Sequence, residues 1–349
     1  DFKLKSLFLI GMAQTRMGAF SDAKKSFRKV IDLAPESPEG MQSVAALKAS
    51  PKKAKNFSAT ASLKHTVDTN VVLAPSSQSA GVIVSRSHDT ATALALNLVY
   101  ASQVNNNWGY SMGYGYSQNI QRRLSFFDTL SQHVDFSPNL RLGKGSAFVQ
   151  FSADALGVDY RRYLFSFGAM PGYAFSYKDH QQGLIRAGYT RKLFFWTPAN
   201  ADERQTGHNY LLAYTHSFLP GTAVPVIQQL LADKGSRLDL GYTFDIDSTR
   251  GANWDYKGYR ATISLTKPIR EKLQLLVNVD DYRQDYVHKH TSFNKTRHDH
   301  LMTLNSALEW QIRPYAKLTL RGMIMRAKSN ISVFDYHKST LTAGIEGRF

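Results

Sequence analysis

Alternation of apolar and polar residues with a period of two runs through residues 56–349, in segments separated by turn residues. Successive side chains of a β-strand point to opposite faces, so this pattern predicts strands with one apolar and one polar face. In one segment Trp108, Tyr110 and Met112 alternate with Gly109 and Ser111. We count about fourteen such segments, each near the length that a tilted membrane-crossing strand needs.

The composition agrees with strands that cross a membrane. No stretch of the sequence approaches the roughly 18 uncharged apolar residues of a membrane helix. The mean hydropathy is −0.33, which suits a barrel because alternating strands average to a polar composition. The chain is rich in aromatic residues, with 20 Phe, 18 Tyr and 4 Trp, and the absence of Cys excludes disulfides and thiolate chemistry.

The connections between the segments alternate in length. Outer-membrane barrels have short periplasmic turns and long external loops, and this parity holds here if one more external connection lies near Asp159–Arg162. The short connections are Asn105–Asn107, Gly143–Gly145, Lys178–Gln182, Lys267–Lys272 and Arg313–Ala316, and the long ones are Thr69–His88, Gln118–Phe127, Trp196–Gly207, Asp247–Asp255, Val287–His298 and Asn330–Asp335.

One connection on the predicted periplasmic side is long. In Pro220–Ser236, the spacing of Val226, Leu230 and Leu231 predicts a short amphipathic helix. This helix would pack on the N-terminal segment or plug the barrel mouth. An ornamented turn with no such role is the alternative.

The C-terminal residues complete the prediction of the fold. Leu341, Ala343, Ile345 and Phe349 fall on one face of a final strand, which resembles the signal that outer-membrane assembly machinery reads. We therefore predict a mainly β protein, a transmembrane antiparallel β-barrel of about fourteen strands, preceded by a short α-helical segment. We expect it in the bacterial outer membrane, with the helical segment in the periplasm.

The N-terminal segment, residues 1–48, is predicted to be helical, and residues 49–55, with three Lys and a Pro, to be a linker to the barrel of residues 56–349. Residues 4–35 have the spacing of a helical hairpin, and a further helix is expected around Pro38–Leu47. The hairpin resembles one tetratricopeptide repeat, and a plain helical hairpin is the alternative. Asp1 opens directly into helical sequence, so we expect upstream residues to have been removed. The packing residues that the resemblance implies are Gly11, Gly18, Ala23, Phe27 and Pro35.

Charged residues on the polar face of the strands are predicted to line the lumen. They would form either a salt-bridged wall or a polar conduit with a weak anion preference. Replacing Arg237, Arg260 and Arg321 by Glu would then alter anion selectivity. The predicted lumen residues are Lys64, Arg141, Arg186, Arg237, Asp239, Arg260, Asp280, Glu309, Lys317, Arg321, Lys338 and Arg348, with Asp154, Asp245 and Glu346 on the same face.

No motif for catalysis, a cofactor or a metal stands out. His288, His290, His298 and His300 occur in or beside a predicted external loop with Lys289, Lys295 and Arg297. We expect this basic loop to contact lipopolysaccharide phosphates in the outer-membrane lipid, with metal binding as the alternative. The net charge is +16. We interpret it as spread over turns, loops and lumen, and expect neither an enzyme nor a nucleic-acid partner.

Two short motifs point to a family. Two segments resemble sequence motifs of the surface lipoprotein assembly modifiers. They are His65–Val71 and Ser329–Tyr336, the latter with Ser329-Asn330-Ile331 and Asp335-Tyr336. Those proteins also join periplasmic tetratricopeptide repeats to a barrel of about fourteen strands. The resemblance implies a barrel that helps a periplasmic or secreted client, a lipoprotein, reach the cell surface. The alternatives are an exporter of an anionic polysaccharide, and a porin or structural barrel of a larger envelope complex.

Overall fold

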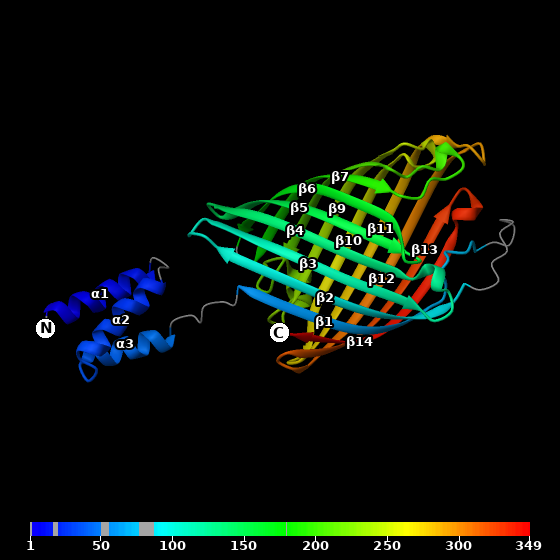
Figure 1. Ribbon diagram of the computed structural model, residues 1–349. Coiled ribbons are helices and arrows are strands. Elements are labelled where there is room, and N and C mark those ends of the chain that lie inside the picture. The colour runs from blue at the N-terminus through cyan, green and yellow to red at the C-terminus, as the bar shows by residue number, and fades with distance from the viewer. Residues whose placement is uncertain (1, 17–19, 50–55, 77–86, 179) are drawn as a thin grey trace. The chain divides into compact units, whose positions relative to one another are not determined.

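The computed structural model describes residues 2–16, 20–49, 56–76, 87–178 and 180–349. The chain divides into two compact units, Asp1–Asn56 and Phe57–Phe349. The first is helical and the second is a β-barrel (Figure 1). None of the described helices is long and apolar enough to cross a membrane.

The helical unit contains α1 (Phe2–Arg16), α2 (Phe20–Leu33) and α3 (Pro38–Ala49). Its core is formed by Ala23, Phe27 and Val30 of α2, which are at most 1% exposed. The ring centroids of Phe27 and Phe8 lie 5.9 Å apart. A Cβ added to Gly11 would lie 2.7 Å from Cε1 of the Phe27 ring. Gly11 is thus a point of close approach between α1 and α2.

The ends of these helices bear on the predicted boundaries. Helix α2 ends at Leu33, two residues before Pro35, which cannot continue a helix. Helix α3 runs to Ala49, one residue past the predicted boundary at 48. Gly18 and linker residues 50–55 lie outside the described residues, so their predicted roles stay predictions. The tetratricopeptide assignment also stays a prediction.

The described residues of the second unit form a closed barrel of fourteen antiparallel strands, which confirms the predicted fold class. Each strand pairs with its neighbours in sequence, and β1 pairs with β14 to close the barrel. The strands are β1 (Phe57–Asp68), β2 (Asp89–Gln103), β3 (Trp108–Gln121), β4 (Thr129–Leu142), β5 (Gly145–Val158), β6 (Arg161–Lys178), β7 (Gln181–Phe194), β8 (Gly207–Phe218), β9 (Arg237–Thr249), β10 (Tyr256–Arg270), β11 (Leu273–His290), β12 (Lys295–Arg313), β13 (Ala316–Ser329) and β14 (Tyr336–Arg348).

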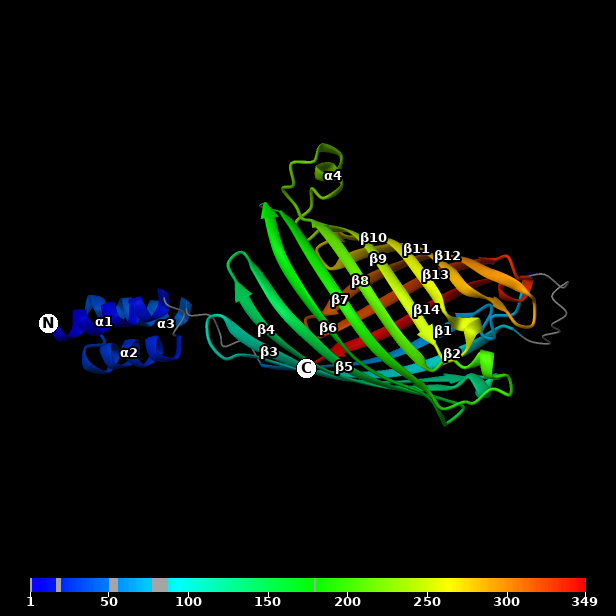
Figure 2. The same ribbon diagram turned by 90° about the horizontal axis from the view of Figure 1, so that it is seen from above.

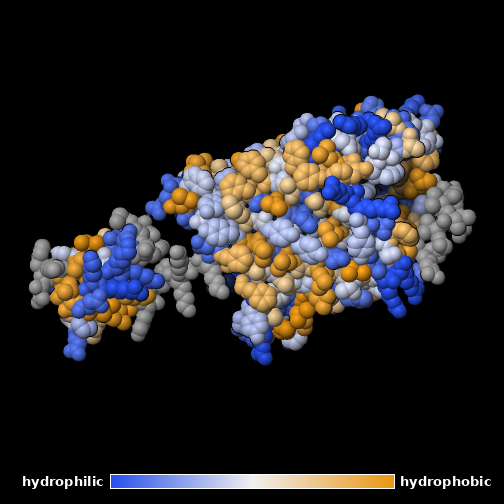
Figure 3. Space-filling model, in the orientation of Figure 1, coloured by the Kyte–Doolittle hydropathy of each residue, from blue (hydrophilic) through white to orange (hydrophobic). Residues whose placement is uncertain are grey.

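The outer face of the barrel is apolar. Large apolar side chains such as Leu63, Leu212 and Ile324 stay 48–60% exposed on it, and Figure 3 shows orange side chains gathered over the strands. Exposed aromatic side chains add a band near each end, with Tyr100, Trp108, Tyr173 and Trp310 in one and Phe167, Tyr189, Tyr210 and Tyr259 in the other. A closed barrel leaves no unpaired strand edge, and an apolar belt between aromatic bands is the surface of a transmembrane β-barrel.

The two ends of the barrel differ in their connections. One end, here the short-turn end, has turns of two to four residues between consecutive strands, apart from the connection between β8 and β9. That connection contains the predicted short helix, α4 (Pro225–Leu230), which lies beyond the ends of β8 and β9 in Figure 2. The opposite end, the long-loop end, carries the other connections. There the expected extra connection between β5 and β6 is a two-residue turn, Asp159-Tyr160, with both residues at positive φ.

One predicted loop is wrong. The segment Val287–His298 is mostly strand: β11 continues to His290, β12 begins at Lys295, and only four residues form the turn. From Asp281 onward most outward-facing positions of this hairpin are polar: Arg283 lies opposite His300, and Asp285 lies opposite His298. The hairpin therefore extends past the apolar belt. Strands in water can be polar on both faces, so the alternation that reveals a strand in the membrane is lost there.

Candidate functional site

The strand registers place the twelve predicted lumen residues on one face of the barrel wall. On β1, Leu63 and Val67 are exposed on the outer face, so Lys64 between them points to the lumen. The same parity holds for the other eleven residues. Pairing across strands brings Lys317 opposite Glu346, and Arg321 opposite Thr342.

Many of these residues form ion pairs across or along the wall. Arg237 Nε lies 2.7 Å from Asp239 Oδ1, and Arg260 Nη1 lies 3.8 Å from Asp280 Oδ2 and stacks on the Tyr282 ring. The Nζ atom of Lys317 bridges Glu309 at 3.1 Å and Glu346 at 3.3 Å, and Lys338 Nζ lies 2.7 Å from Asp68 Oδ2. Around these residues the lumen face is a salt-bridged wall.

Five of the predicted lumen cations have no ion pair. Among the described residues, no carboxylate lies within ion-pair distance of Lys64, Arg141, Arg186, Arg321 or Arg348. Arg141, Arg186 and Arg321 each lie in the half of the strand toward the short-turn end, whereas Lys64 lies past the middle of β1 and Arg348 is the last residue of β14. Arg141 lines a cavity of about 590 Å³ there with Lys144 and Arg237, and the Nε atom of Arg186 is buried without a hydrogen-bond partner.

Charge is consequently unevenly distributed along the barrel axis. Toward the short-turn end, the lumen face carries Arg141, Arg186, Arg237, Lys317, Arg321 and Arg348 against Asp239, Asp280, Glu309 and Glu346. Toward the long-loop end it carries Lys64, Lys192, Arg260, Arg297 and Lys338 against Asp68, Asp89, Asp135, Asp154, Asp245, Asp247 and Asp299. One half of the lumen is net basic and the other is net acidic.

At the long-loop end, residues from distant loops interlock. The carboxylate of Glu203 in η3 (Ala201–Glu203) accepts hydrogen bonds from Asn253 Nδ2 at 2.7 Å and Trp254 Nε1 at 2.9 Å, both in η4 (Ala252–Trp254). Asn253 in turn accepts a bond from the backbone N–H of Thr291 in the β11–β12 turn, at 2.9 Å. These hydrogen bonds join three loops that lie far apart in sequence into one cap.

His290 packs in this cap, past the apolar belt. Its Nε2 atom lies 3.6 Å from Glu203 Oε1 and its ring contacts Phe293 and Phe334. Burial lowers the pKa of His290, and the nearby Arg297 lowers it further, against the opposing attraction of Glu203. Both effects favour the neutral imidazole.

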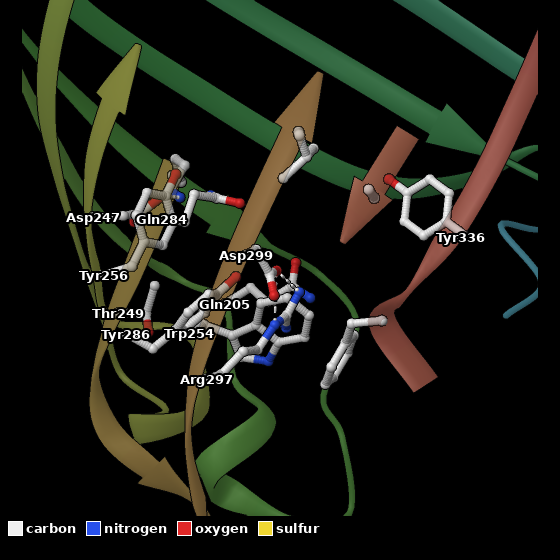
Figure 4. A pocket seen from close by; sticks show the side chains of 14 residues that line it. Gln205, Asp247, Thr249, Trp254, Tyr256, Gln284, Tyr286, Arg297, Asp299 and Tyr336 are labelled. Atoms are coloured by element: carbon white, nitrogen blue, oxygen red, sulfur yellow. Dashed lines mark hydrogen bonds and ion pairs between the residues drawn. The ribbon is translucent and has the colours of Figure 1, made fainter. Parts of the chain in front are cut away.

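A cavity of about 260 Å³ lies beside the cap. Arg297 is the centre of its wall: the guanidinium carbon lies 3.4 Å from the centroid of the Phe334 ring and 4.5 Å from that of Tyr286. Arg297 Nε donates to Asp299 Oδ2 at 2.8 Å. In Figure 4, Tyr336 lies across the pocket from Asp247 and Tyr256. A second ion pair, between Lys192 and Asp247, completes the charged lining.

The sequence did not single out this pocket. Arg297 was assigned to a loop, whereas it is a buried residue of β12. The available signal was aromatic: Tyr282 and Tyr286 fall on the polar, lumen-facing positions of β11, where the pattern leads one to expect small or charged residues.

The four histidines of the predicted basic loop do not converge. His298 pairs with Asp285 at 2.8 Å, His300 with Asp281 at 2.8 Å and His288 with Asp255 at 3.4 Å. Within the part of the chain that the structure describes, no three His, Asp or Glu side chains gather as metal ligands.

No protein-family model matches this chain, and no curated protein matches it in sequence. Solved barrels resemble it in fold. The Acinetobacter baumannii protein OccAB3 has a TM-score of 0.44 at 7% identity, covering 84% of this chain and 100% of its own. OmpT, an outer membrane protein of Vibrio cholerae, has a TM-score of 0.45 at 8% identity, covering 84% of this chain and 99% of its own. A bacterial polysaccharide outer membrane secretin has a TM-score of 0.42 at 8% identity, covering 85% of this chain and 100% of its own. A shared barrel fold does not determine function.

Proposed function

We propose that this protein is an outer-membrane transport barrel that carries an anionic solute or polymer through its lumen. The observation that supports this most directly is the set of uncompensated arginines, Arg141, Arg186 and Arg321, in the basic half of the lumen. An unpaired cation in a dry wall would cost several kcal/mol. A hydrated passage removes that cost, and rings of arginine favour anions.

The direction of transport follows from the asymmetry of the ends. Short turns face the periplasm in outer-membrane barrels and long loops face outward. The basic half would then open to the periplasm and collect anions there, as in export of an anionic polysaccharide. The helical unit, which precedes β1 at the short-turn end, would also be periplasmic.

Delivery of a surface lipoprotein is a second candidate, and a different observation favours it. The helical unit leaves large apolar side chains in water: Leu9 is 64% exposed, Ile10 47% and Met41 60%. Exposed apolar surface of this kind suits contact with a client protein. This function would depend on the helices rather than on the lumen arginines.

A deletion strain separates the two functions. We would compare it with strains complemented by the wild type or by a triple variant, Arg141→Glu, Arg186→Glu and Arg321→Glu, using surface proteomics and polysaccharide staining. Our proposal predicts loss of an anionic polymer from the surface, restored by the wild type and not by the variant. Loss of surface lipoproteins with polymer intact, rescued equally by both, would contradict our proposal and support client delivery.

A further inference from the structure

We propose that the cavity beside the long-loop cap is a binding site for one neutral sugar unit, held by Arg297, Asp299 and Asp247. This site uses residues at the opposite end of the lumen from the uncompensated arginines. It therefore goes beyond the proposed anion transport and does not depend on it.

Unpartnered polar atoms are the first observation. Arg297, Asp299 and Asp247 are only 5–7% exposed, yet Nη1 of the arginine and Oδ1 of both carboxylates have no hydrogen-bond partner. Leaving such groups unpaired costs about 1–3 kcal/mol each. Together they offer one donor and two acceptors. Hydroxyl groups can satisfy both kinds at once, since each O–H donates and accepts.

The charge of the lining selects a neutral ligand. Lys192 is paired with Asp247, and Arg297 with Asp299, so the two cations and two anions cancel. A sugar hydroxyl can donate to a free carboxylate oxygen without disturbing either pair. The carboxylate of an acidic sugar would lose its hydration in this partly desolvated site and gain no net attraction from the neutral lining.

The aromatic lining and the size suit a sugar ring. Trp254, Tyr256, Tyr286 and Tyr336 all line the cavity, and Figure 4 shows Tyr336 on the side opposite Tyr256. An aromatic face packs well against the C–H face of a pyranose, while the phenol groups add polar contacts. The cavity of about 260 Å³ is smaller than the roughly 300–1,000 Å³ of pockets for drug-sized ligands, so it accommodates a single ring.

Titration calorimetry on the full-length protein in detergent tests this site. The probes are D-glucose, N-acetyl-D-glucosamine and D-glucuronate. We expect saturable binding of at least one neutral sugar, and binding of glucuronate at least tenfold weaker. Because Trp254 lines the cavity, the same sugar should change tryptophan fluorescence, and Trp254→Phe should remove that change.

Two variants and a matched control locate the site. Asp299→Asn removes a pocket carboxylate, and Tyr336→Leu removes an aromatic wall while keeping apolar bulk. Asp285→Asn is the control, because Asp285 is 56% exposed on the same hairpin and pairs with His298 outside the cavity. We expect each pocket variant to weaken sugar binding at least tenfold and the control to bind as the wild type does.

The proposal would be overturned if neither D-glucose nor N-acetyl-D-glucosamine binds saturably. It would also be overturned if glucuronate binds as tightly as the neutral sugars, or if Asp285→Asn weakens sugar binding as much as the pocket variants do. If Asp299→Asn does not fold, Tyr336→Leu decides alone. None of these outcomes bears on anion transport, which is measured with the arginine variants of the opposite half.

Discussion

The ion pair between Asp68 and Lys338 should stabilise the closure of the barrel. It joins β1 to β14, the two strands that close the barrel and that share nine residue pairs. Lys338 Nζ lies 2.7 Å from Asp68 Oδ2, and the side chains are only 18% and 12% exposed. Asp68 Oδ1 also accepts the backbone N–H of Asn70 at 2.9 Å.

The cost of breaking this pair can be bounded from its burial. Removing one partner of a fully buried pair costs about 3–5 kcal/mol, whereas an exposed pair contributes about 0–1 kcal/mol. Asp68→Asn keeps an acceptor for the Asn70 N–H and removes only the charge. We therefore expect it to lower the free energy of unfolding by about 2 kcal/mol, with a coupling energy to Lys338→Met of about 1 kcal/mol or more.

The coupling energy is measured by a double-mutant cycle of Asp68→Asn and Lys338→Met, with denaturant unfolding in detergent micelles followed by tryptophan fluorescence. The matched control is Asp159 with Arg161, where the closest N···O distance is 4.0 Å and the arginine is 87% exposed. Its coupling should be near zero. Equal coupling energies for the two cycles would refute the reasoning that burial at the closing strands gives the Asp68–Lys338 pair its strength.

Two further predictions concern the helical unit and the cap. Gly11→Ala places a Cβ 2.7 Å from the Phe27 ring and should destabilise the helical unit by about 1–3 kcal/mol, seen as faster hydrogen exchange in α1 and α2; unchanged exchange would show that the ring yields freely. His290 has a lowered pKa in the folded protein, so the unfolded cap binds more protons and stability falls as pH drops below about 6.5. After correction for intrinsic rates, exchange at the turn after His290 should therefore be faster at pH 5 than at pH 7.5, and His290→Gln should remove the difference.

The sequence predicts the barrel well because a membrane imposes one rule on every strand. Each strand must be apolar outward, so side chains such as Leu63 and Lys64 separate by parity alone. The hairpin around His290 escaped prediction because it lies beyond the apolar belt, where that rule no longer acts.

The candidate sites were less predictable. Parity placed Arg237, Asp239 and Arg321 on the same face, and the two-residue spacing already puts Asp239 beside Arg237. Only the register shows that Arg321 lies opposite Ala307 and Thr342, where there is no carboxylate. The pocket around Arg297 requires residues from β7, β9, β12 and the loop before β14 to meet. Such contacts depend on closure of the barrel and on loop packing, and neither leaves a local pattern in the sequence.

The central claim, that the lumen conducts anions past uncompensated arginines, is tested most directly by the reversal potential of the purified protein in planar bilayers under a KCl gradient. A charge roughly 8 Å from the axis changes the energy of a monovalent ion by about 0.2 kcal/mol in 0.15 M salt, once screening is included. Changing Arg141, Arg186 and Arg321 to Glu alters the charge by six units, which raises the energy of a monovalent anion by about 1.1 kcal/mol and lowers that of a cation by the same amount. The anion-to-cation permeability ratio therefore changes by about 2.2 kcal/mol, or about fortyfold. We predict an anion-selective wild type and a triple variant shifted by that factor toward cations, with Arg283→Glu on the outer face unchanged. A triple variant with the selectivity of the wild type would contradict the account.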